Sequence, residues 1–130
     1  MPMISIDTNI LIRLFTGDDR LQADKARQLF ENEQIYITKT VMRETEWVLR
    51  FAYAFSADAI AMAFTKLLGQ DNVTVEDAHH INMAVNLLRN GLDFADALHL
   101  ACSQNYAFST FDKKLKAKAD SAGIKNVSLL

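Results

Sequence analysis

Residues 3–19 read MISIDTNILIRLFTGDD, and this stretch decides the fold that we expect. The run at 3–6 is short and mostly large and apolar, which is typical of a buried strand. After Asp7 the apolar residues continue at helical spacing. Gly17 then follows, where a helix commonly ends because glycine adopts the left-handed conformation without strain. The stretch therefore predicts a strand that leads directly into a helix, with an acid at the junction.

The same alternation of elements continues to the end of the chain. Gly69, Gly91 and Gly123 also follow helical patterns, and we expect them to end helices in the same way. Runs rich in β-branched and aromatic residues predict further strands at 35–37, 73–75, 106–109 and 126–130. Between the successive strands lie two, two, two and one helices. This order predicts an α/β fold, a three-layer α/β/α sandwich with a central, mostly parallel β-sheet.

The composition favours one soluble domain over residues 1–130. Half of the 130 residues are hydrophobic, which suffices for one compact core. No secretory signal and no apolar run of about 20 residues is apparent, so we expect a cytoplasmic protein without a membrane span. The net charge of -2 gives no overall basic field, so nucleic-acid binding would depend on local features. The single Cys102 lies in an apolar helical run, and we expect it to be buried.

Several acids fall where parallel sheets carry their binding sites, beyond the carboxyl ends of the strands. Asp7 follows the first strand, and Asp112 follows the strand expected at 106–109. Asp96 lies in the first turn of a helix that begins near Asp93. Each acid also has a structural alternative, because Asp7 and Asp112 are suited to capping the helices that follow them. Asp93 and Asp96 have the spacing of a capping pair.

A further acid, Glu44, is selected by its helical face in the run at 40–53, TVMRETEWVLRFAY. Residues three and four apart share a helical face, so we expect Glu44 to point with the apolar core stripe. A buried carboxylate is costly unless something positive compensates it, and a metal ion is the natural candidate. We expect Glu46 on the opposite, solvated side, in an ion pair with Arg50 four residues further on.

Four acids form the predicted constellation: Asp7, Glu44, Asp96 and Asp112. Carboxylates that crowd together repel one another unless a cation neutralises them. A site made only of oxygen ligands favours a hard ion, so we expect Mg²⁺ or Mn²⁺ rather than zinc. The three histidines lack a shared ligand spacing and are not expected to bind the metal.

Four segments of the chain match a known pattern: IDTNILIRLFTGDD at 6–19, ETEWVLR at 44–50, GLDFADALHLA at 91–101 and STFDKKL at 109–115. Through them the chain resembles the PIN-domain ribonucleases, most closely the VapC-type toxins of bacterial toxin–antitoxin modules. The resemblance extends from the first strand to the last helix. In this branch the helical acid is followed three residues later by WVL, which favours Glu44 over Glu46.

The resemblance implies a divalent-metal-dependent endoribonuclease whose catalytic, metal-binding acids are Asp7, Glu44, Asp96 and Asp112. It also implies a cognate VapB-like antitoxin and a homodimeric toxin. We expect Asp7 and Asp96 to be direct ligands, while the tasks of the other two acids stay open. The supporting polar residues would be Asn9, Asp93, Ser109 and Thr110.

Some basic residues near the acids are candidate RNA contacts: Arg13, Arg43, Lys113 and Lys114. The lysines are equally consistent with a solvated helical face, and contacts to phosphate would position RNA without reading its sequence. A second apolar stripe repeats every four residues at Trp47, Phe51 and Phe55. This stripe would either pack within the chain or form a dimer or antitoxin surface.

Three other functions are alternatives for this sequence. A phosphatase of the haloacid dehalogenase type needs a second Asp two positions after the first, and this chain has Asn9 there. A non-catalytic RNA-binding or partner-binding module of the same fold is disfavoured because all four acids are present. A PIN nuclease that processes RNA outside any toxin module remains a distinct alternative.

Overall fold

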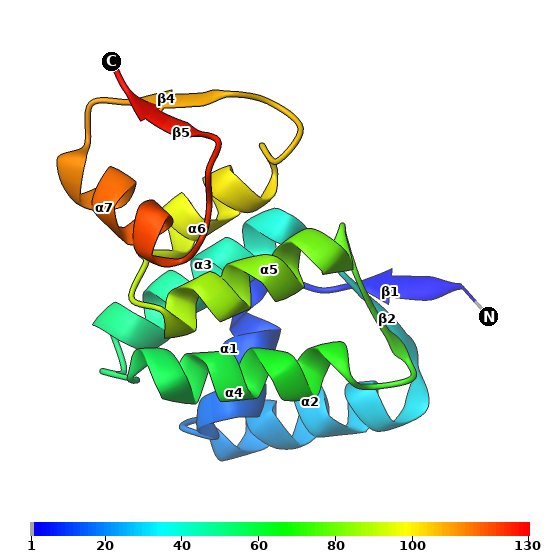
Figure 1. Ribbon diagram of the computed structural model, residues 1–130. Helices are drawn as coiled ribbons and strands as arrows, with labels where there is room; N and C mark the ends of the chain where they lie inside the picture. Colours follow the sequence, from blue (N-terminus) through cyan, green and yellow to red (C-terminus); the bar gives the residue numbers. More distant parts are fainter. Residues whose placement is uncertain (1) are drawn as a thin grey trace. The chain divides into compact units, whose positions relative to one another are not determined.

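The computed structural model describes residues 2–130, and its elements follow one another in the predicted order (Figure 1). The elements are β1 (Met3–Ser5), α1 (Thr8–Thr16), α2 (Arg20–Asn32), β2 (Gln34–Ile37), α3 (Lys39–Phe51), α4 (Ala57–Leu68), β3 (Val73–Val75), α5 (Ala78–Arg89), α6 (Phe94–Ala101), β4 (Phe108–Thr110), α7 (Lys113–Ser121) and β5 (Val127–Leu129). None of the helices within residues 2–130 is long and apolar enough to cross a bilayer. The predicted alternation of strands and helices is confirmed.

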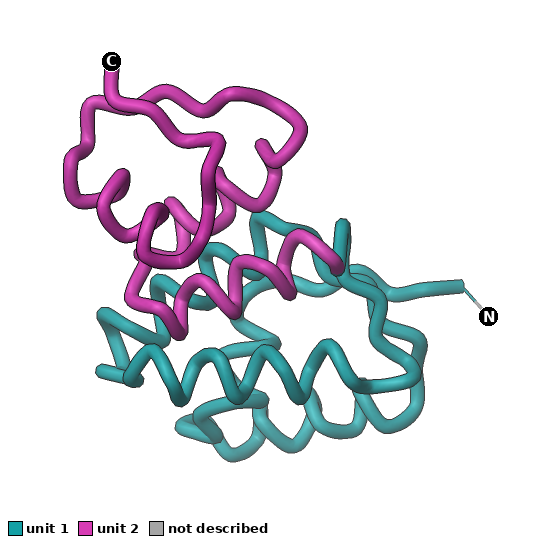
Figure 2. The backbone as a smooth tube through the Cα atoms, in the orientation of Figure 1, with its two compact units in different colours: residues 1–78 teal, residues 79–130 magenta. Residues whose placement is uncertain are grey.

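The chain forms two compact units, residues 1–78 and residues 79–130 (Figure 2). Unit 1 contains a parallel sheet in the order β1–β2–β3, and unit 2 contains the parallel pair β4–β5. The α/β class with parallel strands is therefore confirmed. The described strands are hydrogen-bonded in two sets rather than as one continuous ladder.

In unit 1 the parallel register brings the carboxyl ends of the strands to one edge of the sheet. Ile35 of β2 lies opposite both Ile4 and Val73, and it is completely buried. The chain leaves this edge through α1 after β1 and through α3 after β2. Both helices therefore begin at the edge where parallel sheets carry their binding sites.

In unit 2 the short helix α6 precedes β4, and the short helix α7 connects β4 to β5. Most residues of these two strands are not buried. Phe94, Ala97 and Leu100 lie on the buried side of α6. The strands β4 and β5 pair in register from Phe108 opposite Val127 onwards. The helices α5 and α6 each contribute five buried apolar residues to this unit, so the position of α6 in unit 2 depends on hydrophobic burial.

Cys102 is exposed, so the prediction that it lies in the core is wrong. The helix α6 ends at Ala101, and Cys102 is the residue just after its last turn. The apolar pattern of the sequence continues past this helix end. A longer helix would have carried Cys102 on its buried face, but the helix ends one residue before it. Its Sγ atom lies 3.8 Å from Nδ1 of His80.

The glycines after α1 and α4 differ in backbone conformation. Gly17 is left-handed, with φ of 66°, and its N–H bonds to the carbonyl of Arg13. Gly69 has φ of -85° in the right-handed region, so the expectation of a left-handed end is wrong there. The Gly69 N–H donates to the carbonyls of Thr65 and Lys66, both at 3.2 Å, and these bonds satisfy the helix end without a left-handed residue. A Cβ at Gly17 would meet no atom within 4 Å, and one at Gly69 would have its nearest contacts at 3.6 Å, an ordinary separation.

These two glycines form a matched pair for a stability measurement. We expect Gly17→Ala to lower the free energy of unfolding by about 1 kcal/mol, because alanine is strained in the left-handed region. Gly69→Ala should leave it unchanged or raise it by up to about 1 kcal/mol, because the unfolded chain loses freedom and the native backbone is compatible. Urea denaturation of both variants measures the difference, and equal destabilisation would contradict the assigned conformations.

Candidate active site

Asp7 stands at the junction of β1 and α1 in unit 1. The preceding residue, Ile6, is buried, and its N–H bonds to the carbonyl of Tyr36 in β2 at 3.3 Å. Asp7 caps α1, and its Oδ1 accepts a hydrogen bond from the N–H of Thr8 at 2.7 Å. The capping role weighed from the sequence is therefore confirmed. The cap uses Oδ1 of Asp7. Because the residue is exposed, its carboxylate can also bind a ligand.

Thr8 connects Asp7 to Glu44, which comes from α3. Thr8 is only 5% exposed, and its hydroxyl donates a hydrogen bond to Oε1 of Glu44. The same residue thus binds the Asp7 carboxylate through its backbone and the Glu44 carboxylate through its side chain. Sequence analysis gave Thr8 no functional role, since a threonine beside an acid at a helix start is ordinary capping chemistry.

The buried face of α3 differs from the sequence prediction. Met42, Thr45, Glu46 and Leu49 are buried, whereas Glu44 is exposed. The stripe at 42, 45, 46 and 49 has the i, i+3, i+4, i+7 spacing of a core face, and it lies one step round from the row that contains Glu44. The expectation that Glu44 points with the core is therefore wrong. Its support as a site residue comes instead from its bond to Thr8.

Glu46 is buried, with only 2% of its surface exposed, so its predicted solvated position is also wrong. Its ion pair with Arg50 is confirmed, with Oε2 2.8 Å from Nε of the guanidinium. A buried carboxylate needs such charged hydrogen-bond partners to offset its desolvation. These contacts give Glu46 a structural role within α3.

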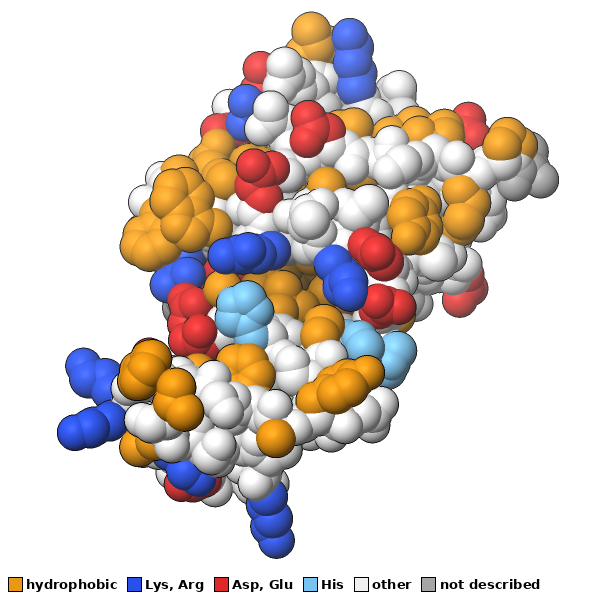
Figure 3. All heavy atoms as spheres, turned by 90° about the horizontal axis from the view of Figure 1, so that it is seen from above, with side chains coloured by type: hydrophobic (Ala, Val, Ile, Leu, Met, Phe, Trp, Pro, Cys, Tyr) orange, Lys and Arg blue, Asp and Glu red, His pale blue; other side chains and the backbone are white. Residues whose placement is uncertain are grey.

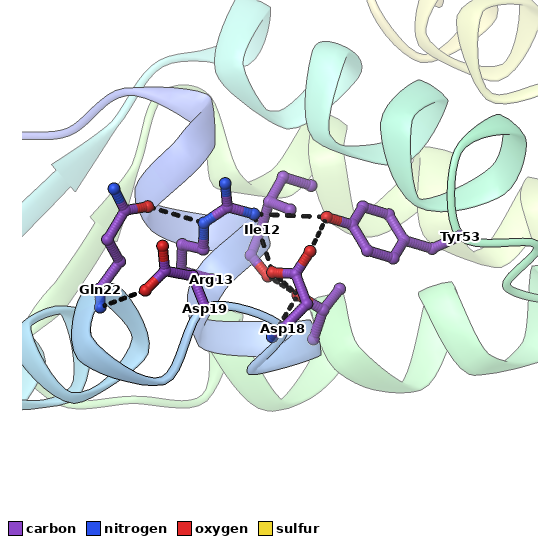
Figure 4. A network of polar contacts seen from close by, with 7 residues as sticks. Ile12, Arg13, Asp18, Asp19, Gln22 and Tyr53 are labelled. Carbon is purple, nitrogen blue, oxygen red and sulfur yellow. Dashed lines mark hydrogen bonds and ion pairs between the residues drawn. The ribbon is translucent and has the colours of Figure 1, made fainter.

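Arg13, a candidate RNA contact, is held in a polar network in unit 1 (Figure 4). Its Nε donates to Oε1 of Gln22 at 2.7 Å, and its Nη1 lies 2.8 Å from Oδ1 of Asp18 and 3.3 Å from the Tyr53 hydroxyl. Desolvation works against the charge, yet the hydrogen bond with Tyr53 and the attraction of Asp18 raise the pKa of Arg13. Arg43, another candidate RNA contact, is exposed next to Glu44 on α3. Arg13 is thus a fixed cation two turns along α1 from Asp7.

In unit 2 the charges of Asp93 and Asp112 act on a third acid, Asp96. Asp96 is half-buried in the first turn of α6. Desolvation and then the negative charge of Asp93, with a smaller contribution from Asp112, raise the pKa of Asp96, although His99 and Lys118 act in the opposite direction. Asp93 occupies the N-cap position of α6, but its side chain makes no capping hydrogen bond. The capping-pair alternative therefore does not explain Asp93.

Asp112 caps α7, and Thr110 supports the turn that carries it. Oδ1 of Asp112 accepts from the N–H of Leu115 at 3.0 Å, and the hydroxyl of Thr110 accepts from the N–H of Asp112 at 3.0 Å. Thr110 and the exposed Ser109 both belong to β4. The candidate RNA contacts of this unit, Lys113 and Lys114, are exposed in the first turn of α7.

The donors fit a hard divalent ion by their chemistry. Within residues 2–130, no three His, Cys, Asp or Glu side chains form a group that could hold a metal ion. The acids instead lie in two sets, Asp7 with Glu44 in unit 1 and Asp96 with its acidic neighbours in unit 2. Every donor is a carboxylate oxygen, the kind preferred by hard divalent ions. Desolvation and the charge of Asp93 raise the pKa of Asp96, and a bound cation would act in the opposite direction.

Asp96→Asn should stabilise the metal-free protein at neutral pH. Because the folded pKa of Asp96 is raised above its ordinary 3.8, the ionised group destabilises the fold at every pH above the folded value. We expect a melting temperature a few degrees above that of the original protein in EDTA at pH 7. The difference should shrink as the pH falls through the folded pKa and vanish below 3.8. Melting curves across this range measure it, and a lower melting temperature for the variant at pH 7 would contradict the assigned environment.

Comparison with known proteins identifies the family. A model described as the PIN domain matches residues 4–121, which includes all four predicted acids. Searches of curated proteins and of solved structures gave no match. PIN domains are generally nucleases that depend on divalent metal ions, in agreement with an acidic site. The match covers nearly the whole chain, and the protein therefore belongs to the PIN domain family.

Proposed function

We propose that this protein is a divalent-metal-dependent endoribonuclease that hydrolyses RNA phosphodiester bonds. The observation that carries the proposal is the double contact of Thr8 with Asp7 and Glu44, which joins two acids from different elements. They meet at the carboxyl end of β1, where parallel sheets carry their sites. Membership of the PIN family supports nuclease activity. In the proposal Asp96 and Asp112 of unit 2 complete the catalytic constellation.

When bound, Mg²⁺ or Mn²⁺ would stabilise charge on the phosphodiester and activate a water for attack. Asp7 and Asp96 are the proposed direct ligands. Glu44 would orient the attacking water or bind through it, because the Thr8 hydroxyl holds one of its oxygens in place. Asp112 would act in the same way from the turn that Thr110 supports. The neighbouring polar side chains of Asn9, Asp93 and Ser109 are proposed to orient water and ligand.

RNA binding would depend on cations beside the acids. Figure 3 shows a face on which basic, acidic and apolar side chains are interspersed, in agreement with the net charge of -2. We propose that Arg43, Lys113 and Lys114, which are all exposed, contact phosphates. Such contacts position a strand without reading its sequence. Arg13 would contribute as a cation whose place is fixed by its own network.

We further propose that the nuclease is the toxin of a VapBC-type toxin–antitoxin system in the cytoplasm, a homodimer neutralised by a VapB-like antitoxin. The similarity of four segments to VapC-type toxins supports this role. Trp47 and Phe51 on α3 are 56% and 61% exposed, and the centroids of their rings lie 5.2 Å apart. Exposed aromatic pairs of this kind are typical of protein–protein interfaces. Phe55, the third residue of the predicted stripe, is half-buried beyond the end of α3.

The purified protein should cleave structured RNA with Mg²⁺ or Mn²⁺ and stop when EDTA is added. Asp7→Asn and Asp96→Asn should each lower kcat/KM by about 100-fold or more, because each removes a charge used only when the metal and phosphate are bound. Circular dichroism would establish that both variants are folded. Metal-independent cleavage, or full activity in both variants, would overturn the proposal.

Expression in a bacterial host extends the same test to the biological role. Growth arrest by the original protein but not by Asp7→Asn, together with a small open reading frame just upstream, would support a toxin. Cleavage without growth arrest would favour a PIN nuclease of RNA processing. Tight RNA binding without any turnover would favour a non-catalytic module of the same fold.

The two glutamates of α3 should respond differently to substitution by glutamine. We expect Glu44→Gln to abolish cleavage with little change in stability, because Glu44 is exposed and glutamine keeps a side-chain oxygen that can accept the hydrogen bond from Thr8. Glu46→Gln should keep cleavage per folded molecule but lower stability by about 1–3 kcal/mol, because it weakens a buried charged contact with Arg50. Denaturation curves and cleavage rates separate the effects. The opposite pattern would reassign the catalytic role to Glu46.

A further inference from the structure

Unit 1 has a pocket between α1 and α2, with a volume of about 460 Å³. Its floor is apolar and consists of Ile10 on α1 with Ala26 and Leu29 on α2. The lining residues of each helix have helical spacing and share one face, so the pocket lies between two facing helical surfaces. We refer to it as the α1–α2 pocket.

The polar lining of the α1–α2 pocket consists of two amides, Asn9 and Gln22, and two cations, Arg13 and Lys25. No acid lines it. The larger pocket of the same unit is also lined by two cations, Arg27 and Lys66, but it has Glu31 among its lining residues as well. Arg13 is paired with Asp18 outside the lining, so Lys25 is the main source of the positive charge that makes the pocket complementary to an anionic ligand in a chain of net charge -2.

The α1–α2 pocket begins close to the acids of unit 1. Asn9 and Ile10 lie in the first turn of α1, which starts directly after Asp7. A helix rises 1.5 Å per residue, so Arg13 lies roughly 9 Å from Asp7 along the helix axis. The end of the pocket lined by Asn9 is less than one turn from Asp7, so a strand with a phosphate at Asp7 would have its neighbouring nucleotide within reach of that end.

The cations of the α1–α2 pocket are prepared for binding in different ways. Arg13 uses Nε and Nη1 in its network with Gln22, Asp18 and Tyr53, and its Nη2 has no hydrogen bond within residues 2–130 (Figure 4). The bond from Arg13 occupies Oε1 of Gln22 and thereby orients its amide group. Lys25 is exposed and is in no ion pair within the described chain. Fixed donors lose less entropy on binding than mobile ones, which favours recognition by Arg13 and Gln22.

We propose that the α1–α2 pocket binds the nucleotide next to the scissile phosphate in single-stranded RNA. The base would lie on the apolar floor with its edge toward the amides of Asn9 and Gln22, while Arg13 and Lys25 contact phosphate. Unpaired bases are the parts of RNA whose edges proteins read most readily. The inference rests on the proposed ribonuclease function and assigns to this pocket the preference for one base over another.

Binding of fluorescein-labelled single-stranded RNA, measured by anisotropy in EDTA, tests the pocket without cleavage. Lys25→Gln should weaken binding several-fold and reduce the slope of log K against log salt by about 1, as expected for loss of one phosphate contact. Arg27→Gln is the matched control, since it removes the same charge from α2 at a residue that lines the other pocket. Arg27→Gln should bind as the original protein does.

Gln22→Ala tests base recognition in the same assay. With poly(A), poly(C) and poly(U) oligonucleotides, it should change the ratios of the dissociation constants by several-fold and leave the salt slope unchanged. Unchanged binding in both Lys25→Gln and Gln22→Ala would overturn the inference. The inference would also be overturned if Lys25→Gln weakened the binding of a cognate antitoxin peptide and left RNA binding unchanged. The pocket would then be a protein-binding site.

Cleavage kinetics distinguish failure of the pocket from failure of the proposed activity. If the protein cleaves RNA, Lys25→Gln should raise KM with kcat nearly unchanged, whereas Arg27→Gln should alter neither. Cleavage with an unchanged KM in Lys25→Gln would contradict the pocket alone. Absence of cleavage together with the expected loss of RNA binding would contradict the nuclease and leave the nucleotide site supported.

Discussion

The buried hydroxyl of Thr8 is the contact on which the arrangement of unit 1 around its acids depends. A hydroxyl that is buried without a partner costs about 1–3 kcal/mol, and here the partner is the carboxylate of Glu44. The N–H of the same residue binds the Asp7 carboxylate. One threonine therefore links the start of α1 to the acid that α3 presents, and the same contact contributes to the packing of this unit and to its site.

Three of the four acids of the proposed site lie at the starts of helices, and this position makes their charge tolerable. Asp7 caps α1, Asp112 caps α7 and Asp96 lies in the first turn of α6. The partial positive charge of a helix N-terminus favours a carboxylate there. For Asp96, however, desolvation and the charge of Asp93 outweigh this effect and raise its pKa. Capping and metal binding are thus compatible roles, and the structural alternative for each acid does not exclude the functional one.

The sequence predicted the order of elements well, because buried strands and helix ends have strong local signals. The sequence did not predict which face of a helix is buried where tertiary contacts decide this. In α3 the buried row that contains Met42 and Leu49 lies about 100°, one residue, round the helix from the row through Glu44, and both rows contain apolar residues at helical spacing. Glu46 is buried and paired with Arg50. The sequence of α3 predicts the pair, but it does not show that the carboxylate is buried. Thr8 was missed for the same reason, since its partner is 36 residues away in the sequence.

The charges of α1 show how helix stability and the proposed chemistry agree. Asp7 lies at the N-terminus of the helix and Arg13 in its last turn, so each charge is of the sign that the helix dipole favours at that end. The same order places an acid for a metal ion at one end and a cation for phosphate further along. Asp18 and Tyr53 hold the cation in place, and the hydrogen bond from Tyr53 is the main cause of the lowered pKa of Asp18. An acidic site on a protein of negative net charge needs such a nearby cation to attract a polyanion, and α1 provides one without a basic surface.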